Sequence, residues 1–358
     1  MKRTLRFLLA GLSILVVFAT MLYSCRTTTE YVGGVQINEF NQGVWAATLK
    51  SSGMNTTQLT AYAKQGKWNS DHLFWDFSDT TYMIQRIRML KKQETKVVLV
   101  LRIALQHEFD ENMYKWHGMI YPTTREQQDE WFYRYRFFVE MWAKICEREG
   151  VEVLAISSEM SSLTGTIQRT NFTDLVNHFS SREKQLNHEL KIAEYQEQLN
   201  VHNIWEYGRP IDTNIRKFIL DKIESNIQWT QEAFHTDQPN SISYINQERK
   251  YLDSTWRDII ANARTYYNGK LTMAANYDSY DDISFWDDLD FIGINAYFPL
   301  RAVNRTPISN DSIYREIVSG WEKVFQELDE FKSAHQLKDK PIFFTEIGYT
   351  QKEFCTVA

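Results

Sequence analysis

Segments with the pattern of a β-strand recur seven times along the chain, the first two short and weakly marked, and stretches of helical pattern separate several of them. Residues 97–101, Val-Val-Leu-Val-Leu, form the near-continuous apolar run expected of a parallel strand that helices cover. Strands of this kind, alternating with helices, predict an α/β fold built on a parallel sheet. The predicted strands span residues 34–40, 55–63, 96–102, 151–159, 271–277, 291–297 and 340–346.

Four amphipathic stripes predict helices around these strands, because apolar residues recur there every three or four positions. Two of these helices have recognisable starts, a Ser78-Asp79 cap and a Thr123-x-x-Glu126 capping box, and the second should end near Gly150. The four stripes are Met83, Ile87 and Leu90; Trp131, Tyr135, Phe138, Trp142 and Ile145; Trp256, Ile259, Ile260, Ala263 and Tyr267; and Ile317, Trp321, Val324, Leu328 and Phe331.

The length of the chain and the number of strands narrow the fold class. A chain of 358 residues accommodates one α/β barrel of about 250 residues with additions better than two equal domains. Only 12 residues follow Glu346, which is too few for a further helix and strand. The sequence therefore predicts a (β/α)8 TIM-barrel-like fold in which the eighth strand is missing or truncated.

A long insertion interrupts the barrel pattern after the fourth strand. Residues 160–254 are polar and largely helical in pattern, and Ile215, Ile219, Ile223 and Ile227 mark one long helix. The segment is far longer than a usual strand-to-helix connection. Because it leaves from the rim where the fourth strand ends, we expect it to cover or wall a cleft there. The alternative is a solvated decoration with no part in the chemistry.

The first 25 residues have the pattern of a bacterial lipoprotein signal. A basic start precedes an apolar core over residues 7–22, and Leu22-Tyr-Ser-Cys25 resembles a lipobox, whose cysteine becomes lipidated and N-terminal after cleavage. Residues 26–33 would then be a tether and residues 34–358 the barrel. This pattern predicts a lipid-anchored protein of the bacterial cell envelope, periplasmic or on the outer surface. An uncleaved anchor helix is the alternative, since the apolar stretch just reaches the lower limit for a span.

Composition and charge exclude several classes of function. A net charge of −6 without a basic run beyond the N-terminus argues against a nucleic-acid partner. No His, Cys or Asp cluster has metal-ligand spacing, and no Gly-rich phosphate loop is present, so we expect neither a metal nor an organic cofactor. His107 and His117 are expected to be solvated, and Cys146 to be a small core residue. The oligomeric state does not follow from the sequence.

Two predicted strands end on a glutamate, and this pair carries the candidate chemistry. Glu159 closes the fourth strand and Glu346 the last. The carboxyl ends of barrel strands face one rim, where barrel active sites lie. A retaining glycosidase needs one carboxyl that starts protonated and one that stays ionised, about 5–5.5 Å apart, so their surroundings must separate their pKa values. The two glutamates therefore indicate glycoside hydrolysis.

Several motifs, in their order and spacing, resemble glycoside hydrolase family 113, a family of retaining (β/α)8-barrel glycosidases known for β-mannanases. The resemblance covers roughly residues 97–349 apart from the insertion. The motifs are Trp116-His-Gly-Met-Ile, the helix from Trp131 to Ile145, Ser158-Glu159, Trp256-Arg-Asp-Ile-Ile with Arg264-x-Tyr-Tyr-x-Gly, Phe285-Trp-x-x-Leu-Asp-x-Ile-Gly-Ile-Asn-Ala-Tyr-Phe-Pro-Leu300, and Thr345-Glu-Ile-Gly-Tyr349.

The resemblance implies roles for individual residues. It makes Glu159 the general acid/base and Glu346 the nucleophile, with Tyr297 in the place of a tyrosine that holds the nucleophile ionised and oriented. Trp116 is a candidate sugar platform. Three polar residues at strand ends on the same rim are further candidates for substrate contacts or, alternatively, caps of their own loops: Arg102, Asn276 and Asn295.

Two departures from the family pattern bear on the substrate. Ser158 stands where related enzymes often have an asparagine that bonds the sugar 2-hydroxyl, and Arg102-Ile-Ala104 replaces a Lys-Pro-His-like run. The expected substrate is therefore a β-linked poly- or oligosaccharide, with β-mannan one candidate. A surface glycan-binding lipoprotein without turnover, on a degenerate or truncated barrel, is the competing interpretation, and a truncated product without a stable fold is a third.

Overall fold

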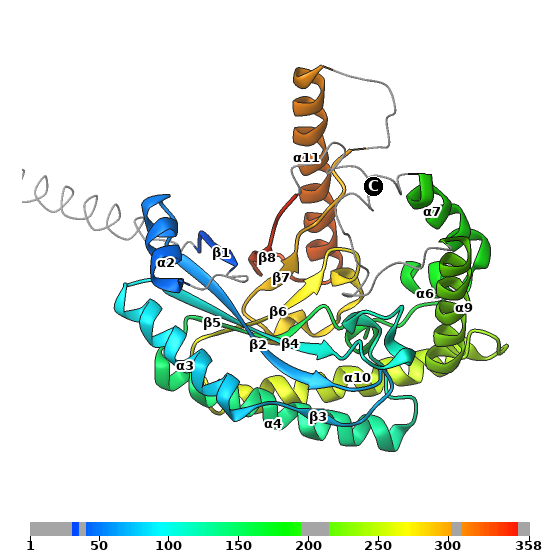
Figure 1. Cartoon of the computed structure of the whole chain (residues 1–358), viewed down its shortest axis with the longest axis horizontal. Helices are drawn as coiled ribbons and strands as arrows, with labels where there is room; N and C mark the ends of the chain where they lie inside the picture. Colours follow the sequence, from blue (N-terminus) through cyan, green and yellow to red (C-terminus); the bar gives the residue numbers. More distant parts are fainter. Residues whose placement is uncertain (1–30, 36–40, 195–214, 302–308, 350–358) are drawn as a thin grey trace, which may run out of the picture.

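The structure is a computed structural model, and it describes residues 31–35, 41–194, 215–301 and 309–349. Parallel strands form most of a barrel, in the order β1-β2-β4-β5-β6-β7-β8 (Figure 1). Each of the seven predicted strands is confirmed, although residues 36–40 of the first lie outside the described residues. The strands are β1 (Gly33–Val35), β2 (Thr56–Gln65), β4 (Lys96–Leu105), β5 (Val153–Ser158), β6 (Lys270–Asn276), β7 (Ile292–Asn295) and β8 (Ile342–Glu346). A two-residue strand that the sequence did not indicate, β3 (Leu73–Phe74), pairs antiparallel with β2.

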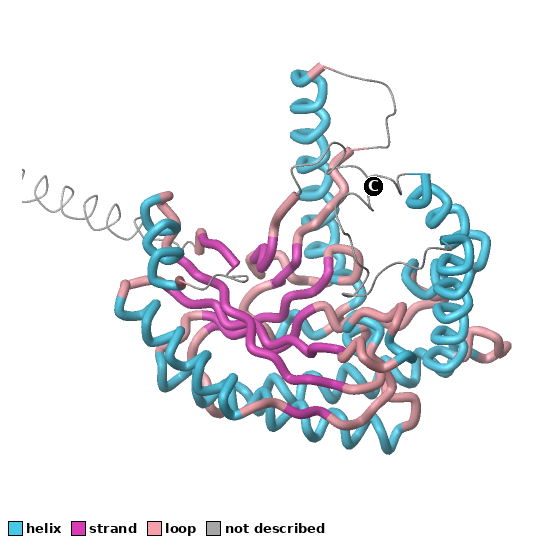
Figure 2. Tube along the Cα trace, in the orientation of Figure 1, coloured by secondary structure: helices cyan, strands magenta, loops and turns pink. Residues whose placement is uncertain are grey.

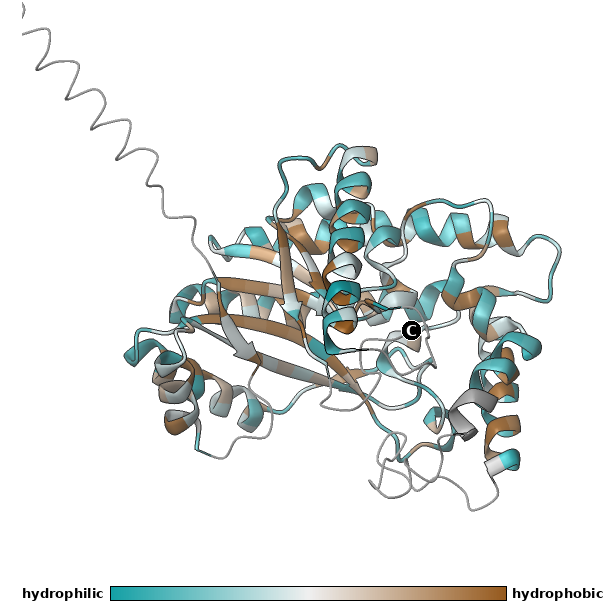
Figure 3. Ribbon diagram, turned by 90° about the horizontal axis from the view of Figure 1, so that it is seen from above, coloured by the Kyte–Doolittle hydropathy of each residue, from teal (hydrophilic) through white to brown (hydrophobic). Residues whose placement is uncertain are grey.

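The predicted helices cover the outside of the strands (Figure 2). Figure 3 shows strands that are largely hydrophobic and helices that carry hydrophobic and hydrophilic residues on different faces. The apolar stripes of α4 and α10 are buried against the barrel, as their spacing predicted. The barrel helices are α2 (Gln42–Ser51), α3 (Phe77–Lys92), α4 (Arg125–Glu149), α10 (Ser241–Arg264) and α11 (Asn310–Ala334). Short 3-10 turns lie in the loops: η1 (Asp110–Asn112), η2 (His117–Met119), η3 (Tyr280–Asp282) and η4 (Phe285–Asp288).

No backbone pairing joins β1 to β8 within the part of the chain that the structure describes. The (β/α)8 TIM-barrel-like fold is thus confirmed, with seven parallel strands among the described residues and no pairing at the place of an eighth. Side chains span the seam, because the ring of Tyr31 lies 5.6 Å from that of Phe343 and 6.2 Å from that of Phe291. These rings pack against the small residues that fill the barrel interior, Val98, Val100, Val153, Ala155 and Ala274.

Two helix starts differ from the predicted ones by one or two residues. The cap of α3 is Asp76, whose carboxylate accepts a hydrogen bond from the Ser78 backbone N–H at 2.6 Å. The capping box of α4 is formed by Thr124 and Gln127, one position later than predicted, since a glutamine can close the box as well as a glutamate. The end of α4 at Gly150 is confirmed, and that residue adopts a left-handed φ of 68°.

The helix predicted to begin at Trp256 in fact begins at Ser241, so the last part of the predicted insertion belongs to the barrel helix α10. Its first turns bury charged residues, which hide the apolar stripe in the sequence. Glu248 accepts a hydrogen bond from Arg125 at 2.6 Å. Arg249 forms a bidentate pair with Asp282, with both contacts at 2.7 Å. Ion pairs therefore replace apolar contacts in this part of the interface.

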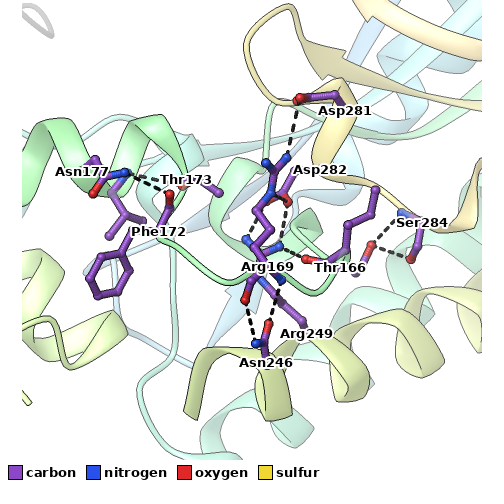
Figure 4. A network of polar contacts seen from close by, with 12 residues as sticks. Thr166, Arg169, Phe172, Thr173, Asn177, Asn246, Arg249, Asp281, Asp282 and Ser284 are labelled. Carbon is purple, nitrogen blue, oxygen red and sulfur yellow. Dashed lines mark hydrogen bonds and ion pairs between the residues drawn. The ribbon is translucent and has the colours of Figure 1, made fainter. Parts of the chain in front are cut away.

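The same aspartate fixes the root of the insertion. The Arg169 guanidinium donates to Asp282 at 2.6 Å, and the Arg169 backbone and Asn246 exchange two hydrogen bonds (Figure 4). Thr166 accepts hydrogen bonds from the backbone N–H and the hydroxyl of Ser284. The segment that follows Glu159 is consequently held to α10 and to the loop after β6.

The helices of the insertion lie beside the carboxyl ends of the strands (Figure 1). The long helix marked by four isoleucines is confirmed as α9, and α9 packs against the loop that connects β4 to α4. The ammonium of Lys115, in that loop, donates to the backbone oxygen of Ser225 at 2.9 Å and to its hydroxyl at 2.5 Å. The described helices are α5 (Ser161–Thr164), α6 (Asp174–Ser180), α7 (Arg182–Glu194) and α9 (Ile215–Phe234).

The predicted signal, Cys25 and most of the predicted tether lie outside the described residues, as does Cys355. Cys146 is buried in α4, as predicted. A search of the described helices finds none that is both long enough and apolar enough to cross a membrane.

Lys115 leads to a prediction about stability. Burial lowers the pKa of this lysine from 10.5 to about 8, so between these pH values the unfolded chain holds a proton that the folded chain has released. The free energy of unfolding should therefore rise with pH across this window, by about 3 kcal/mol in total from this group. Lys115→Met should lack that rise in urea unfolding measured from pH 7.5 to 10.5. The control Lys222→Met, in α9, should keep it, and equal slopes for Lys115→Met and the parent would contradict the assignment.

Candidate active site

Glu159 follows the last residue of β5 and is held there in a strained conformation. Its φ is +51°, a left-handed value that is uncommon for residues other than glycine and costs about 1–3 kcal/mol. A hydrogen bond of 2.8 Å from its backbone N–H to the Ala274 oxygen secures this turn against β6. Strain that the surrounding structure maintains is typical of functional positions.

Glu346 ends β8 and faces Glu159 across the rim. The same Arg102 nitrogen, Nη2, lies 3.3 Å from Glu159 Oε2 and 3.6 Å from Glu346 Oε1. These two oxygens can therefore be at most about 6.9 Å apart, the sum of the two distances. Both carboxylates are mostly buried, with side-chain exposures of 13% each. The structure thus brings together the two predicted glutamates and Arg102.

Glu159 has a partner at each oxygen. Asn295 donates to Oε1 at 2.8 Å, and the Asn295 side chain is itself fixed by a 2.7 Å hydrogen bond from Thr345. His117 Nε2 lies 3.2 Å from Oε2. Burial raises the pKa of Glu159, but the contact with His117, the charge of Arg102 and the hydrogen bond from Asn295 together lower it below its usual value. In the absence of substrate this carboxyl is therefore ionised at neutral pH, although the role implied for it begins with a protonated carboxyl.

Glu346 is hydrogen-bonded to the predicted tyrosine. The Tyr297 hydroxyl donates to Glu346 Oε2 at 2.8 Å. Burial and the negative charge of Glu346 raise the pKa of this phenol, so it remains a neutral donor throughout the working pH range. Tyr297 is still 40% exposed, which leaves part of its ring open to solvent at the rim. The Tyr297 contact holds Oε2, and Oε1 is the oxygen on the side of Arg102.

Trp116 directly precedes His117, whose imidazole contacts Glu159. The tryptophan is half-buried, and its ring stands edge-on to the His117 ring at 5.2 Å. Gly118 passes under the indole so closely that an added Cβ would lie 2.2 Å from it, and only glycine fits there. The role of Trp116 as a sugar platform stays a prediction.

Asn276 lies on β6 level with Asn295 on β7, but its side chain serves its own loop. Its side-chain oxygen accepts a hydrogen bond from the Tyr277 backbone N–H at 2.9 Å, and its backbone oxygen accepts one from Ser279 at 3.0 Å. Neither bond reaches a catalytic candidate. The arrangement corresponds to the alternative noted from the sequence, a polar residue that caps a strand end.

Sequence reasoning missed His117 as a site residue. The expectation that it is solvated was wrong, because its side chain is largely buried against Glu159. The available signal was its position next to Trp116 in a motif of the resemblance. Asp278 was also missed, and its pKa is raised by burial and by the negative charges of Glu159 and Asp281.

Ser158 is fully buried, and its hydroxyl accepts a hydrogen bond from Arg102 Nε at 3.1 Å. The two positions at which the chain departs from the family pattern therefore contact each other. No group of three or more His, Cys, Asp or Glu side chains that could hold a metal ion occurs in the described ranges.

A prediction concerns the charge between the glutamates. Arg102→Met removes a positive charge that lowers the pKa of Glu159, so that pKa should rise. The change can be measured by carboxyl-carbon NMR titration of the Glu159 signal, assigned by comparison with a Glu159→Gln variant. Arg86→Met, on the outer helix α3, is the matched control and should leave this titration unchanged. A Glu159 pKa that is unchanged or lower in Arg102→Met would contradict the assigned contact.

Comparison with known proteins finds a family model that matches part of the chain. Residues 243–358 match the model of Glycoside Hydrolase Family 113, a range that includes Glu346 but not Glu159. No curated protein sequence matches the chain. Among solved structures, the family 113 β-mannanase AaManA from Alicyclobacillus acidocaldarius, in complex with ManMIm, is 16% identical with a TM-score of 0.50 and covers 90% of this chain and 72% of its own. A second family 113 β-1,4-mannanase is 17% identical with a TM-score of 0.47, and covers 88% of this chain and 72% of its own.

AaManA shares the barrel fold with this chain, and the family match includes the strand that carries Glu346. Both findings agree with the motifs in the sequence. The carboxyl-terminal third of the chain is therefore similar to Glycoside Hydrolase Family 113, and this similarity identifies the protein as a glycoside hydrolase.

Proposed function

We propose that the protein hydrolyses β-linked mannan by a retaining mechanism in which Glu346 is the nucleophile and Glu159 the general acid/base. The observation that carries this proposal is the position of Arg102, within 4 Å of both carboxylates, because it keeps two of their oxygens no more than about 6.9 Å apart, close to the roughly 5–5.5 Å that a double displacement needs. The β-mannanase activity of the similar solved enzyme supports the choice of substrate.

In the first step, Glu346 Oε1 attacks the anomeric carbon and the bond to the glycosidic oxygen breaks. Tyr297 holds Oε2, which leaves Oε1 free on the side that faces Arg102. The proton on Glu159 passes to the departing oxygen, so the leaving sugar departs as a neutral alcohol. This step forms a glycosyl ester on Glu346.

Glu159 must be protonated for that step, and its surroundings explain how this can happen. Burial is already the largest single influence on its pKa, and it acts to raise it. A bound sugar removes further water from the carboxyl and so raises the pKa again. Once Glu346 has become an ester, its negative charge is gone, which favours the ionised form of Glu159. That ionised form then takes a proton from water, and the water oxygen attacks the anomeric carbon and releases Glu346.

The proposal is tested by removing each carboxylate. The parent should hydrolyse β-mannan and release the β-anomer first, which NMR of the fresh products detects. Glu159→Gln should lower the rate roughly 10²–10⁴-fold, and Glu346→Gln should lower it at least about a thousandfold. Both variants should still bind mannan, because each substitution keeps the shape of the side chain. The control Glu130→Gln, on the outer face of α4, should keep the parent rate.

Three outcomes would reject parts of the proposal. Binding of mannan by the parent without hydrolysis would favour the glycan-binding alternative. Release of the α-anomer first would contradict retention. Hydrolysis of xylan or β-glucan in preference to mannan would overturn the substrate but leave the two glutamates in their roles.

We also propose that the protein is lipid-anchored in the bacterial cell envelope through Cys25. The support is the lipobox-like sequence that ends at this cysteine. The full chain expressed in a bacterial host fed with radiolabelled palmitate should incorporate the label and partition with membranes. Cys25→Ser should abolish both properties, whereas Cys146→Ser should not. Membrane association of Cys25→Ser equal to that of the parent would favour the uncleaved anchor helix.

A further inference from the structure

The loop that carries His117 to Glu159 is attached to the insertion. This loop, residues 106–124, runs from β4 to α4, and η2 lies within it. On one side, His117 contacts the Glu159 carboxylate at 3.2 Å. On the other side, the loop rests on α9, the long helix of the insertion. The loop therefore links the insertion to the acid/base.

Two polar contacts with α9 lie on either side of His117 along the chain. Two positions before it, the ammonium of Lys115 donates to the backbone oxygen and the hydroxyl of Ser225. Two positions after it, the Met119 backbone oxygen accepts a 2.9 Å hydrogen bond from the Trp229 indole N–H. Residues 225 and 229 are one helical turn apart, so both contacts come from one face of α9.

Further contacts hold the same loop in place. The Tyr114 and Phe218 rings meet at 5.4 Å, and the Tyr121 and Phe234 rings at 5.2 Å, so aromatic pairs with α9 lie outside both polar contacts. Ser162, in α5, donates to the Gly118 backbone oxygen at 2.7 Å. The residue directly after His117 is thus tied to the segment that follows Glu159.

Lys115, which forms one of the two polar contacts, is an unusual residue to bury. Lys115 is only 1% exposed, and taking an ammonium out of water is costly. Ser225 supplies two oxygen acceptors that partly offset the cost. An apolar residue would pack against α9 without this cost, but it would not define the position of the loop by directed hydrogen bonds.

We propose that α9 positions the acid/base: by holding residues 115 and 119, it fixes His117 against Glu159 and so sets the orientation and protonation of that carboxyl. Lys115 and Trp229 are positioning residues in this scheme, since neither touches the reacting atoms. The groups that face Glu159 are His117, Arg102, Asn295 and, across the rim, Glu346 with its partner Tyr297, and the charge of Asp278 is nearby. Only His117 among them is held by α9. This inference rests on the role proposed for Glu159.

A poorly positioned Glu159 should affect two kinds of substrate differently. A sugar leaving group needs a proton from Glu159, whereas 2,4-dinitrophenolate is stable enough to leave without one. A protein with a poorly placed acid should therefore lose activity on mannan and retain it on an activated aryl glycoside. A protein that is merely less folded should lose both activities in proportion.

The test uses Trp229→Phe, which removes the indole N–H without changing a charge and keeps an aromatic ring. We expect kcat/KM on mannan to fall roughly tenfold to a hundredfold and kcat/KM for 2,4-dinitrophenyl β-mannobioside to change by less than about twofold. Lys115→Met should show the same split. Lys222→Met is the matched control, because the partner of Lys222 is Glu189 on α7, within the insertion, and both its activities should stay at the parent level. Equal losses on both substrates, or no loss on mannan, would overturn the proposal.

A titration that does not depend on activity separates this inference from the proposed function. In Trp229→Phe, a loosened His117 should lower the pKa of Glu159 less than it does in the parent, so NMR titration should show that pKa raised. An unchanged Glu159 pKa would overturn the positioning proposal. Should the parent cleave neither substrate, the proposed function fails, and the titration alone then decides whether α9 holds His117 against Glu159.

Discussion

The candidate site depends on one cation placed between two anions. Glu159 and Glu346 stand at the ends of strands on one rim, mostly buried, where two unpaired carboxylates would repel each other and resist ionisation. Arg102 reaches both of them through one nitrogen and also bonds Ser158. The charge of this guanidinium helps to lower the pKa of Glu159, and each carboxylate also accepts a hydrogen bond from a neutral donor of its own, Asn295 for Glu159 and Tyr297 for Glu346.

The sequence predicted the strands well, because their apolar runs reflect burial on both faces. It also placed the two glutamates at one rim, since a polar residue at the end of such a run lies there, whereas the position of Tyr297 followed from the family resemblance. The start of α10 could not be predicted from periodicity, because Glu248 and Arg249 are buried there through ion pairs. His117 was missed for a similar reason: its contact with Glu159 joins two loops, and no local pattern records such a contact.

The contacts of the insertion could not be predicted from its length. The expectation that it covers or walls a cleft stays a prediction, and the described contacts of α9 include two with the loop that carries His117. The network around Asp282 ties the root of the insertion to α10, and α9 then rests on the β4–α4 loop. In this arrangement a peripheral helix can influence a carboxyl that it does not touch.

The open seam of the barrel has a consequence for the proposed nucleophile. Within the described residues β8 pairs only with β7, so Glu346 stands on an edge strand whose other side has no hydrogen-bonded neighbour. Edge strands open at a lower free energy than strands paired on both sides. Fraying of β8 would displace Glu346 while β4 and β5 remained folded, so gentle heating should inactivate the enzyme reversibly before the barrel melts.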